Sequence, residues 1–231
     1  MKMYLGFADM NAGFLIIIAA LILGLVARSQ VTGTYRRFSQ VATGKGMSGA
    51  RTAREILDSY GLSNIDVRQI AGTLTDHYDP SKGVLNLSAG VFGGTSIAAV
   101  GVAAHEAGHA VQDAMGYSPF QIRQKLVPVA NLGSQMLFPL IIGGLFFRIT
   151  ELYYIGAALY GAALLFQLVT LPVEFDASRR AVVYLGQSGS MSSGELNGVK
   201  KVLTAASMTY VAAALASLGQ MVWLLLAGRR R

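Results

Sequence analysis

Stretches without charged residues divide the chain into candidate membrane spans and polar blocks. Five stretches of 18 residues or more contain no Asp, Glu, Lys or Arg: 10–27, 83–104, 126–147, 152–173 and 202–228. Ionisable side chains are costly at the centre of a bilayer, and a spanning helix needs about 20 mostly apolar residues. Each stretch is therefore long enough to be considered as a span.

Four of these stretches have the composition of a spanning helix. The stretch 10–27 carries FLIIIAALILGLVA and stops at Arg28. A secretory signal peptide is the alternative there, but Asp9 and the lack of a convincing cleavage site favour a span. Only four residues separate 126–147 from 152–173, which predicts a tight helical hairpin. In the last stretch, 202–228, Trp223 stands where an interfacial aromatic residue is expected.

The stretch 83–104 reads differently. It holds five glycines and several polar residues, a composition that does not suit a continuous helix facing lipid. The sequence predicts a short strand over 84–87, a glycine-rich turn, and a buried helix over about 96–114, capped by Thr95 or Ser96. We expect a mainly α membrane protein with transmembrane helices at 10–27, 126–147, 152–173 and 202–228.

The polar remainder forms two blocks, 28–125 and 174–201. Two spans separate them, so both blocks must lie on the same side of the membrane. They hold ten and four Lys and Arg residues, against five on the opposite side. The positive-inside rule therefore predicts that both blocks are cytoplasmic, although the arginine tail 229–231 counts against this orientation.

Composition supports a membrane protein and excludes several other classes. The 231 residues are 53% hydrophobic and 13% charged, whereas an average soluble domain is about 25% charged. This excludes a disordered chain and, despite a net charge of +7, argues against a nucleic-acid partner. The basic excess suits a bilayer surface. Because there is no cysteine, disulfides, thiolate zinc sites, iron–sulfur clusters and cysteine nucleophiles are excluded.

One motif carries chemistry. Residues 103–117 read AAHEAGHAVQDAMGY, and inside them His105, Glu106 and His109 form HExxH. On a helix, positions i and i+4 lie on one face, so two imidazoles can bind one cation while the glutamate reaches its water. Two imidazoles, a carboxylate and an open position are typical of catalytic Zn²⁺, and we expect one ion per chain.

The third ligand has to come from another part of the chain. The segment LPVEFDASRRA begins where the stretch 152–173 ends, and Pro172 is placed to break the span there. A helix continuing beyond it would hold Glu174 at the membrane edge. The residues alone leave five candidates for the third ligand: Glu174, Asp176, His77, Asp113 and Asp79.

At these motifs the chain resembles a known family. HEAGHAVQDAMGY, DHYDPSKGVLNLS, LVTLPVEFDASRRA and VLTAASMTYVAAAL look like the YugP-type membrane neutral zinc metallopeptidases of bacteria, in order and spacing over nearly the whole chain. A more distant likeness is to the HtpX-type and CAAX-prenyl membrane proteases, which pair HExxH with a glutamate ligand in an ExxAD element. Glu174 to Ala177 match that element, and Ser178 stands where the aspartate would be.

The resemblance implies a gluzincin-like zinc metallopeptidase in the bacterial cell membrane, with Glu174 as third ligand and a small cytoplasmic α+β zincin-like domain. Glu106 would act as general base. The predicted strand, Val84, Leu85, Asn86 and Leu87, would be an edge strand that binds an extended peptide. Around the metal we expect supporting contacts from a further group: Asp113, Asp176, Ser178 and Arg179.

The expected substrates are peptides, membrane proteins or their membrane-proximal segments. Two other functions are compatible with the motif, namely an intramembrane-cleaving metalloprotease and a non-catalytic membrane adaptor stabilised by zinc. An adaptor has no need of Glu106 beside its ligands. The sequence leaves open whether the chain forms a homo-oligomer or binds another membrane protein.

Overall fold

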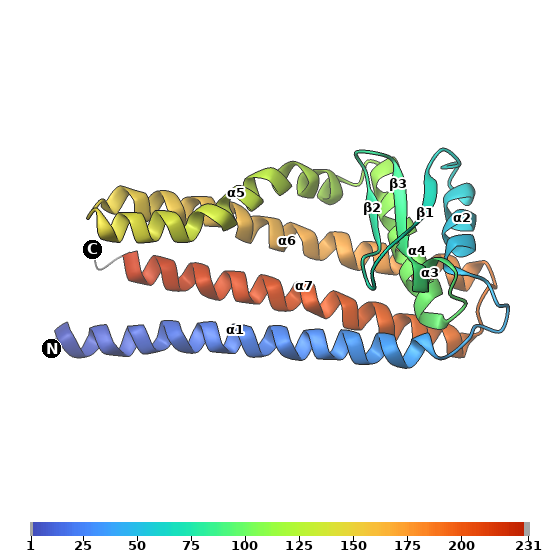
Figure 1. Ribbon diagram of the computed structural model, residues 1–231, viewed down its shortest axis with the longest axis horizontal. Coiled ribbons are helices and arrows are strands. Elements are labelled where there is room, and N and C mark those ends of the chain that lie inside the picture. Colours follow the sequence, from blue (N-terminus) through green and yellow to red (C-terminus); the bar gives the residue numbers. More distant parts are fainter. Residues whose placement is uncertain (1, 229–231) are drawn as a thin grey trace. The chain divides into compact units, whose positions relative to one another are not determined.

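A computed structural model describes the backbone of residues 2–228, and the side chains of residues 15, 16, 18–144 and 146–225. The arginine tail that counts against the expected orientation lies outside these residues. Seven helices and three strands follow in the order α1 Lys2–Ser39, α2 Gly49–Ser59, β1 Asp66–Ile70, β2 His77–Asp79, β3 Val84–Ser88, α3 Ala89–Phe92, α4 Ile97–Ala114, α5 Ser118–Phe146, α6 Thr150–Gln187 and α7 Ser193–Gly228 (Figure 1).

The chain divides into two compact units. One consists of residues 1–27, 122–171 and 209–231, and the other consists of residues 28–121 and 172–208. Helices α1, α5, α6 and α7 each contribute to both units. The second unit therefore joins two segments that are about fifty residues apart in the chain, and it contains the HExxH motif together with Glu174.

The first unit is made of apolar helices. Four helices are long and apolar enough to cross a membrane, over Ile18–Ser39, Ser118–Gly144, Thr150–Gln187 and Ser193–Leu225. Large hydrophobic side chains such as Leu25, Phe138 and Ile142 are more than half exposed, as expected of a surface that faces lipid. A small set of buried residues, including Leu137, Tyr153 and Leu224, packs the helices together.

The helices extend beyond the charge-free stretches. Helix α6 passes through Pro172 without a break, whereas the sequence favoured an interruption there. Proline is tolerated inside long apolar helices because neighbouring groups and local adjustments satisfy the carbonyl that loses its partner. The continuous helix carries Glu174 to Ser178 on the turns that follow Pro172, so their spacing is helical.

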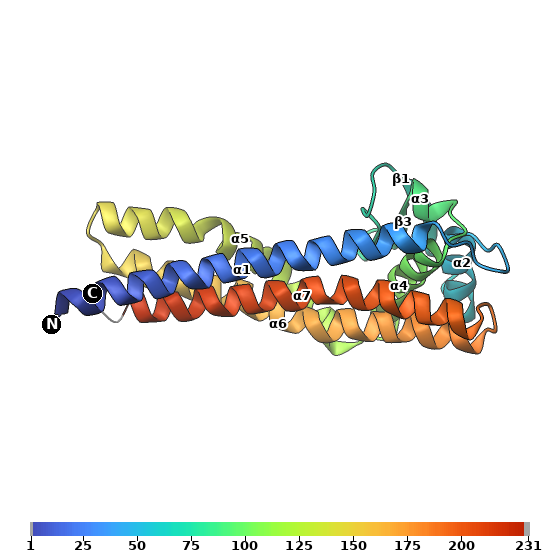
Figure 2. The same cartoon turned by 90° about the horizontal axis from the view of Figure 1, so that it is seen from below.

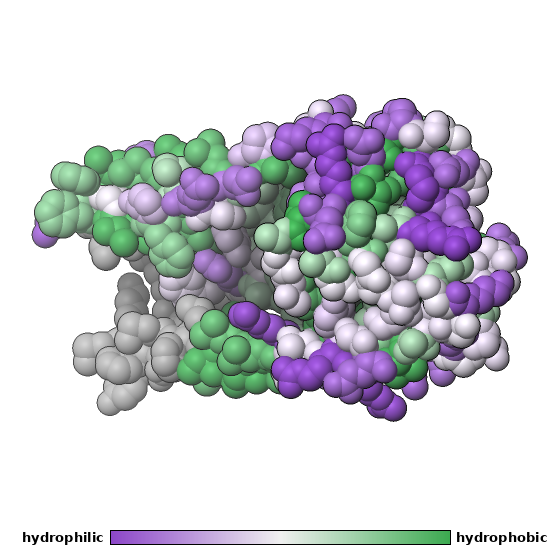
Figure 3. Space-filling model, turned by 45° about the vertical axis from the view of Figure 1, so that its right-hand side comes forward, coloured by the Kyte–Doolittle hydropathy of each residue, from purple (hydrophilic) through white to green (hydrophobic). Residues whose placement is uncertain are grey.

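The second unit packs a small sheet and α2 against α4 (Figure 1). Strand β3 is central: it pairs in parallel with β1, Asp66 opposite Val84, and antiparallel with β2, Tyr78 opposite Leu85. The core beneath contains Leu57, Leu85, Val100 and Leu185 among its buried residues. On the face seen in Figure 3, the surface around this core is largely hydrophilic or neutral.

The expectation that Val84 to Leu87 form an edge strand is wrong. Both edges of β3 are used by its neighbours, and Val84, Leu85 and Leu87 are buried. A strand covered on both faces reads as apolar in sequence whether or not it is at an edge. The two outer strands of the sheet are β1 and β2, and β2 contacts α4.

Candidate metal centre

Helix α4 presents its two histidines side by side. The helix begins after Ser96, whose side chain accepts a hydrogen bond from the Ala99 N–H, and it ends before Gly116, which has a φ of +64°. The motif lies well inside these ends, so its spacing is helical. Since His105 and His109 are four positions apart, they project from one face of the helix. Their ring centroids are 4.7 Å apart at an interplanar angle of 82°.

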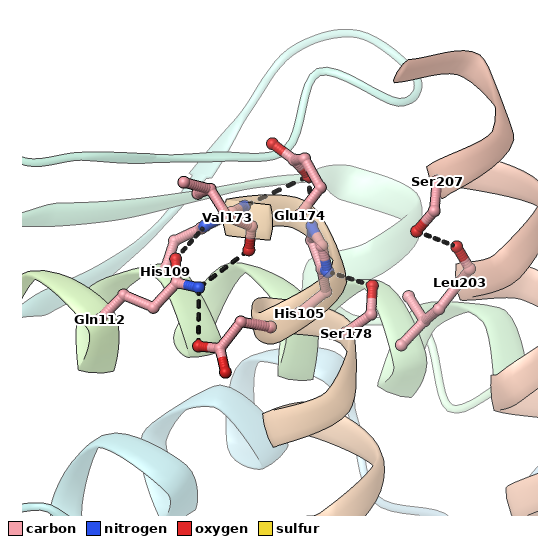
Figure 4. A network of polar contacts seen from close by, with 9 residues as sticks. His105, His109, Gln112, Val173, Glu174, Ser178, Leu203 and Ser207 are labelled. Carbon is pink, nitrogen blue, oxygen red and sulfur yellow. Dashed lines mark hydrogen bonds and ion pairs between the residues drawn. The ribbon is translucent and has the colours of Figure 1, made fainter. Parts of the chain in front are cut away.

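Small residues on α4 let α6 approach closely. A Cβ atom on Gly108 would lie only 2.9 Å from the carbonyl oxygen of Ala177, so this position has no room for any side chain. The close approach sets Glu174 of α6 opposite the histidines. Its side chain is 1% exposed, and its Oε2 atom lies 3.2 Å from His105 Nε2 and 3.6 Å from His109 Nε2 (Figure 4).

The three side chains fit a metal ion. Ligand atoms from His105, His109 and Glu174 all lie within 4.8 Å of one another. Zinc–ligand bonds of about 2.0–2.1 Å in a tetrahedron hold the ligand atoms about 3.3 Å apart, close to the two distances to Glu174. Two imidazole nitrogens and one carboxylate oxygen are also a donor set that Zn²⁺ prefers. The residues present therefore suit this ion.

The other nitrogen of each imidazole is held by a second side chain. His105 Nδ1 lies 3.1 Å from Ser178 Oγ, and His109 Nδ1 lies 3.0 Å from Gln112 Oε1 (Figure 4). The Gln112 oxygen accepts, so His109 carries its proton on Nδ1. Its Nε2 lone pair is then left for a metal, and the ring is fixed in orientation.

Gln112 extends this contact to α6. It is fully buried, and its Nε2 atom donates to Val173 O at 2.8 Å and to Asp176 Oδ2 at 3.0 Å. Asp176 in turn accepts hydrogen bonds from Arg179 and Arg180. Asp176 and Arg179 therefore connect to His109 through Gln112 rather than directly.

Glu106 lies next to the first histidine and faces the sheet. Burial, together with the negative charges of Glu174 and Asp76, raises the pKa of Glu106 to about 7, although His105 and the Tyr78 backbone N–H act in the opposite direction. A carboxyl group with a pKa near neutrality can exchange a proton with water or substrate at physiological pH.

The remaining candidates have other partners. Asp113 accepts a hydrogen bond of 2.9 Å from the Tyr78 hydroxyl, and burial and this contact raise the pKa of Tyr78. His77 Nδ1 contacts the Thr75 carbonyl, and its Nε2 contacts Asn86. The Asp79 carboxylate accepts hydrogen bonds from Ser81 and Lys82, which lower its pKa to about 2. Of the five third-ligand candidates, Glu174 is the one that the described structure groups with both histidines.

The family described as "Putative neutral zinc metallopeptidase" matches residues 13–229. The chain belongs to this family. The "Putative membrane protease YugP" of Bacillus subtilis (strain 168) is 45% identical over 205 residues, which are 89% of this chain and 91% of that protein. No solved structure matches the chain. The resemblance inferred from the motifs is thus confirmed, and with it the assignment to a family of membrane zinc peptidases.

Two residues near the metal centre, Gln112 and Tyr78, were not identified from the sequence. Gln112 follows His109 by three positions, a spacing that places both on one helix face, and this was the available signal. Tyr78 lies on a three-residue strand next to acidic and turn residues, where the pattern resembles a loop. Its contact with Glu106 depends on strand pairing and leaves no local trace in sequence.

Proposed function

We propose that this protein is a membrane-anchored zinc endopeptidase that cleaves membrane proteins or their membrane-proximal segments at the cytoplasmic face of the bacterial cell membrane. The observation that carries the proposal is the convergence of His105 and His109 with Glu174, 65 residues further along the chain than His109, beside a glutamate whose pKa is near 7. A purely structural metal site has no use for such a group.

In this proposal His105, His109 and Glu174 hold one Zn²⁺ ion, and Ser178 and Gln112 orient the two imidazoles. When bound, zinc supplies Lewis-acid chemistry, polarising the scissile carbonyl and lowering the pKa of water. Glu106 takes a proton from the attacking water and delivers it to the leaving amine as the C–N bond breaks. Glu106 thus gains one proton and gives up one proton, and its side chain returns to the carboxylate form.

We assign substrate binding to the outer strand β2 rather than to β3. The backbone N–H of Tyr78 donates a hydrogen bond to the Glu106 carboxylate. It therefore points away from β3 and toward the proposed catalytic glutamate. An extended peptide that added to this edge by main-chain hydrogen bonds would displace the Glu106 carboxylate from the Tyr78 N–H and pass directly beside it. The Tyr78 side chain also contacts α4, because its hydroxyl donates a hydrogen bond to Asp113.

Zinc content and hydrolysis test the proposal together. The full chain is purified in detergent as wild type, Glu174→Ala, Asp176→Ala and Glu106→Gln. We expect Glu174→Ala to lose the metal and Asp176→Ala to retain it. Glu106→Gln should retain zinc and lose cleavage of a quenched-fluorescent peptide library by at least about 100-fold, the usual contribution of a general base.

Other outcomes would point to other functions. Full zinc occupancy in Glu174→Ala contradicts the ligand set. Hydrolysis that survives in Glu106→Gln contradicts the assigned base. An adaptor stabilised by zinc would tolerate Glu106→Gln in every respect, and an intramembrane protease would cleave within a transmembrane segment of a reconstituted substrate rather than next to it.

A further inference from the structure

A basic groove lies between α1 and α7 in the unit that holds the metal centre. Its volume is about 510 Å³, within the range of small-molecule sites. In both ribbon views the ends of α1 and α7 that line it lie next to each other (Figures 1 and 2). No residue of the metal centre lines it, so it is a separate feature of the molecule.

The lining residues form one face of each helix. On α1 they are Gln30, Thr34, Arg37 and Phe38, and on α7 they include Asn197, Lys200, Lys201, Thr204 and Met208. These positions recur at intervals of three and four, so two polar and basic faces oppose each other. Two helices that merely packed together would place apolar side chains on these faces.

Close packing at one end defines the floor of the groove. A Cβ atom on Gly198 would lie 2.9 Å from Phe38 Cε1 and 2.9 Å from Ile97 Cγ2, so the two helices touch there through the Phe38 ring. Arg37, Lys200 and Lys201 line the groove next to this contact. The groove therefore lies beside a close contact between the two helices.

Three cations line the groove, and the Arg37 guanidinium lies over the Phe38 ring, 5.5 Å from its centroid. The groove is lined by no Asp or Glu. Within the described part of the chain, Arg37, Lys200 and Lys201 form no ion pair with a carboxylate. Like charges brought together on one surface repel each other, and an anion between them relieves this repulsion.

The position of the groove along the helices indicates the source of the anion. The charge-free stretch of α1 ends at Ala27, and that of α7 begins at Val202. The groove spans 30–38 and 197–208, so it extends from the polar ends of two candidate spans into the first apolar turns of α7. Phosphate groups of lipids lie at this level of a bilayer, and basic pockets between spans bind them.

We propose that this groove binds the headgroup of an anionic phospholipid, with the phosphodiester between Arg37, Lys200 and Lys201. The hydroxyl of Thr34 and the amide of Asn197 are available as donors to the phosphate or to headgroup hydroxyls. Met208 and Ala205 border the side from which the acyl chains leave. This proposal rests on the protein lying in a membrane, and it does not depend on peptidase activity.

Lipid binding by the detergent-purified full chain tests this proposal. Native mass spectrometry counts bound dioleoylphosphatidylglycerol and, separately, dioleoylphosphatidylcholine. The triple variant Arg37→Gln, Lys200→Gln, Lys201→Gln is compared with Arg36→Gln, Lys45→Gln, Arg68→Gln, which removes the same charge from exposed positions outside the groove. We expect the first variant to weaken phosphatidylglycerol binding by about tenfold or more and the second to leave it within about twofold.

A second variant tests the groove without changing any charge, and it keeps the test valid if the triple variant does not fold. Thr34→Trp fills the groove, keeps every cation, and should also weaken phosphatidylglycerol binding. An equal loss in the control triple variant would show a general charge effect and overturn the proposal. Displacement of the lipid by an equal concentration of inorganic phosphate would do the same, because the ligand would then be a soluble anion. Because neither readout involves zinc or hydrolysis, failure here is distinguishable from failure of the proposed peptidase.

Discussion

Gln112 donates a hydrogen bond of 2.8 Å from its Nε2 atom to the backbone carbonyl oxygen of Val173, the residue before Glu174. The Oε1 atom of the same side chain accepts a hydrogen bond from the Nδ1–H group of His109. One amide therefore connects a candidate ligand on α4 with the backbone that carries the candidate ligand on α6. Because the amide is fully buried, water cannot replace either contact.

Replacing Gln112 with Met should weaken zinc binding while the core remains filled. Methionine has a similar length but neither a donor nor a good acceptor, so the His109 ring loses its orienting partner. Contacts of this kind typically contribute about 10–100-fold to metal affinity. Titration of the purified protein with a zinc chelator of known affinity measures the change.

The matched control is Gln121→Met, which places the same side chain at an exposed position at the start of α5. It should bind zinc as the wild type does. If Gln112→Met also kept wild-type affinity, the amide would serve only the packing of α4 against α6.

Ser178 supports His105 as Gln112 supports His109, but through a hydroxyl group instead of an amide. Ser178→Ala should lower zinc affinity by about tenfold, because the His105 Nδ1 proton loses its acceptor. Ser178→Asp should bind zinc more tightly than Ser178→Ala, since a carboxylate accepts a stronger hydrogen bond and makes the imidazole a better ligand. The same chelator titration measures both variants.

Ser207→Ala is the control for the loss of a buried serine. Its hydroxyl bonds the Leu203 carbonyl within α7 and is 3% exposed, so its removal should leave zinc affinity unchanged. Equal affinities in Ser178→Ala and wild type would mean that His105 is oriented by its other contacts alone.

The helix that carries HExxH could be predicted from the sequence because the residues that define it are close together in the chain. Ser96 caps it, Gly116 follows its end in a left-handed conformation, and the two histidines are one turn apart. The third ligand was not accessible in this way. Glu174 is 69 positions from His105, and five acidic or histidine residues were compatible with the spacing until the resemblance to a family selected one.

The order of the strands and the continuity of α6 could not be predicted from local sequence patterns. The run Val84 to Leu87 predicts a strand but not its neighbours, and its central position depends on pairing with β1 and β2. Similarly, Pro172 is a strong local signal against a helix, and the packing of the surrounding turns overrides it. In both cases tertiary contacts decide the outcome, and the local sequence does not.

Gly108 should be intolerant of the smallest substitution. A Cβ atom there would lie 2.9 Å from the Ala177 carbonyl oxygen, so Gly108→Ala must push α6 away from α4. We expect a loss of about 1–3 kcal/mol of stability, the usual cost of overpacking, together with weaker zinc binding because Glu174 moves with α6. Thermal denaturation in detergent and the chelator titration measure the two effects.

Gly33→Ala is the corresponding control on α1, where a Cβ atom meets nothing within 4 Å. This exposed helical position should gain slightly in stability, since alanine favours a helix by about 1 kcal/mol over glycine. Wild-type stability and zinc affinity in Gly108→Ala would show that α4 and α6 can separate without disturbing the ligands.

The raised pKa of Glu106 makes the stability of the metal-free protein depend on pH. Its pKa is about 7 in the folded protein against a usual value of 4.5, because burial disfavours the charged form. The folded state therefore holds a proton that the unfolded state releases. Stability contributed by this group is fully present below pH 4.5 and is lost as the pH rises through about 7.

Glu106→Gln isolates this contribution, because the amide has nearly the same shape and cannot ionise. After zinc removal with EDTA, the melting temperature of the wild type should fall relative to that of Glu106→Gln between about pH 5 and about pH 8. The two proteins should differ least at the acidic end, where Glu106 is protonated. Parallel melting curves over the whole range would mean that Glu106 ionises in the folded protein as readily as in water, and its suitability as a base near neutral pH would then have to come entirely from the metal.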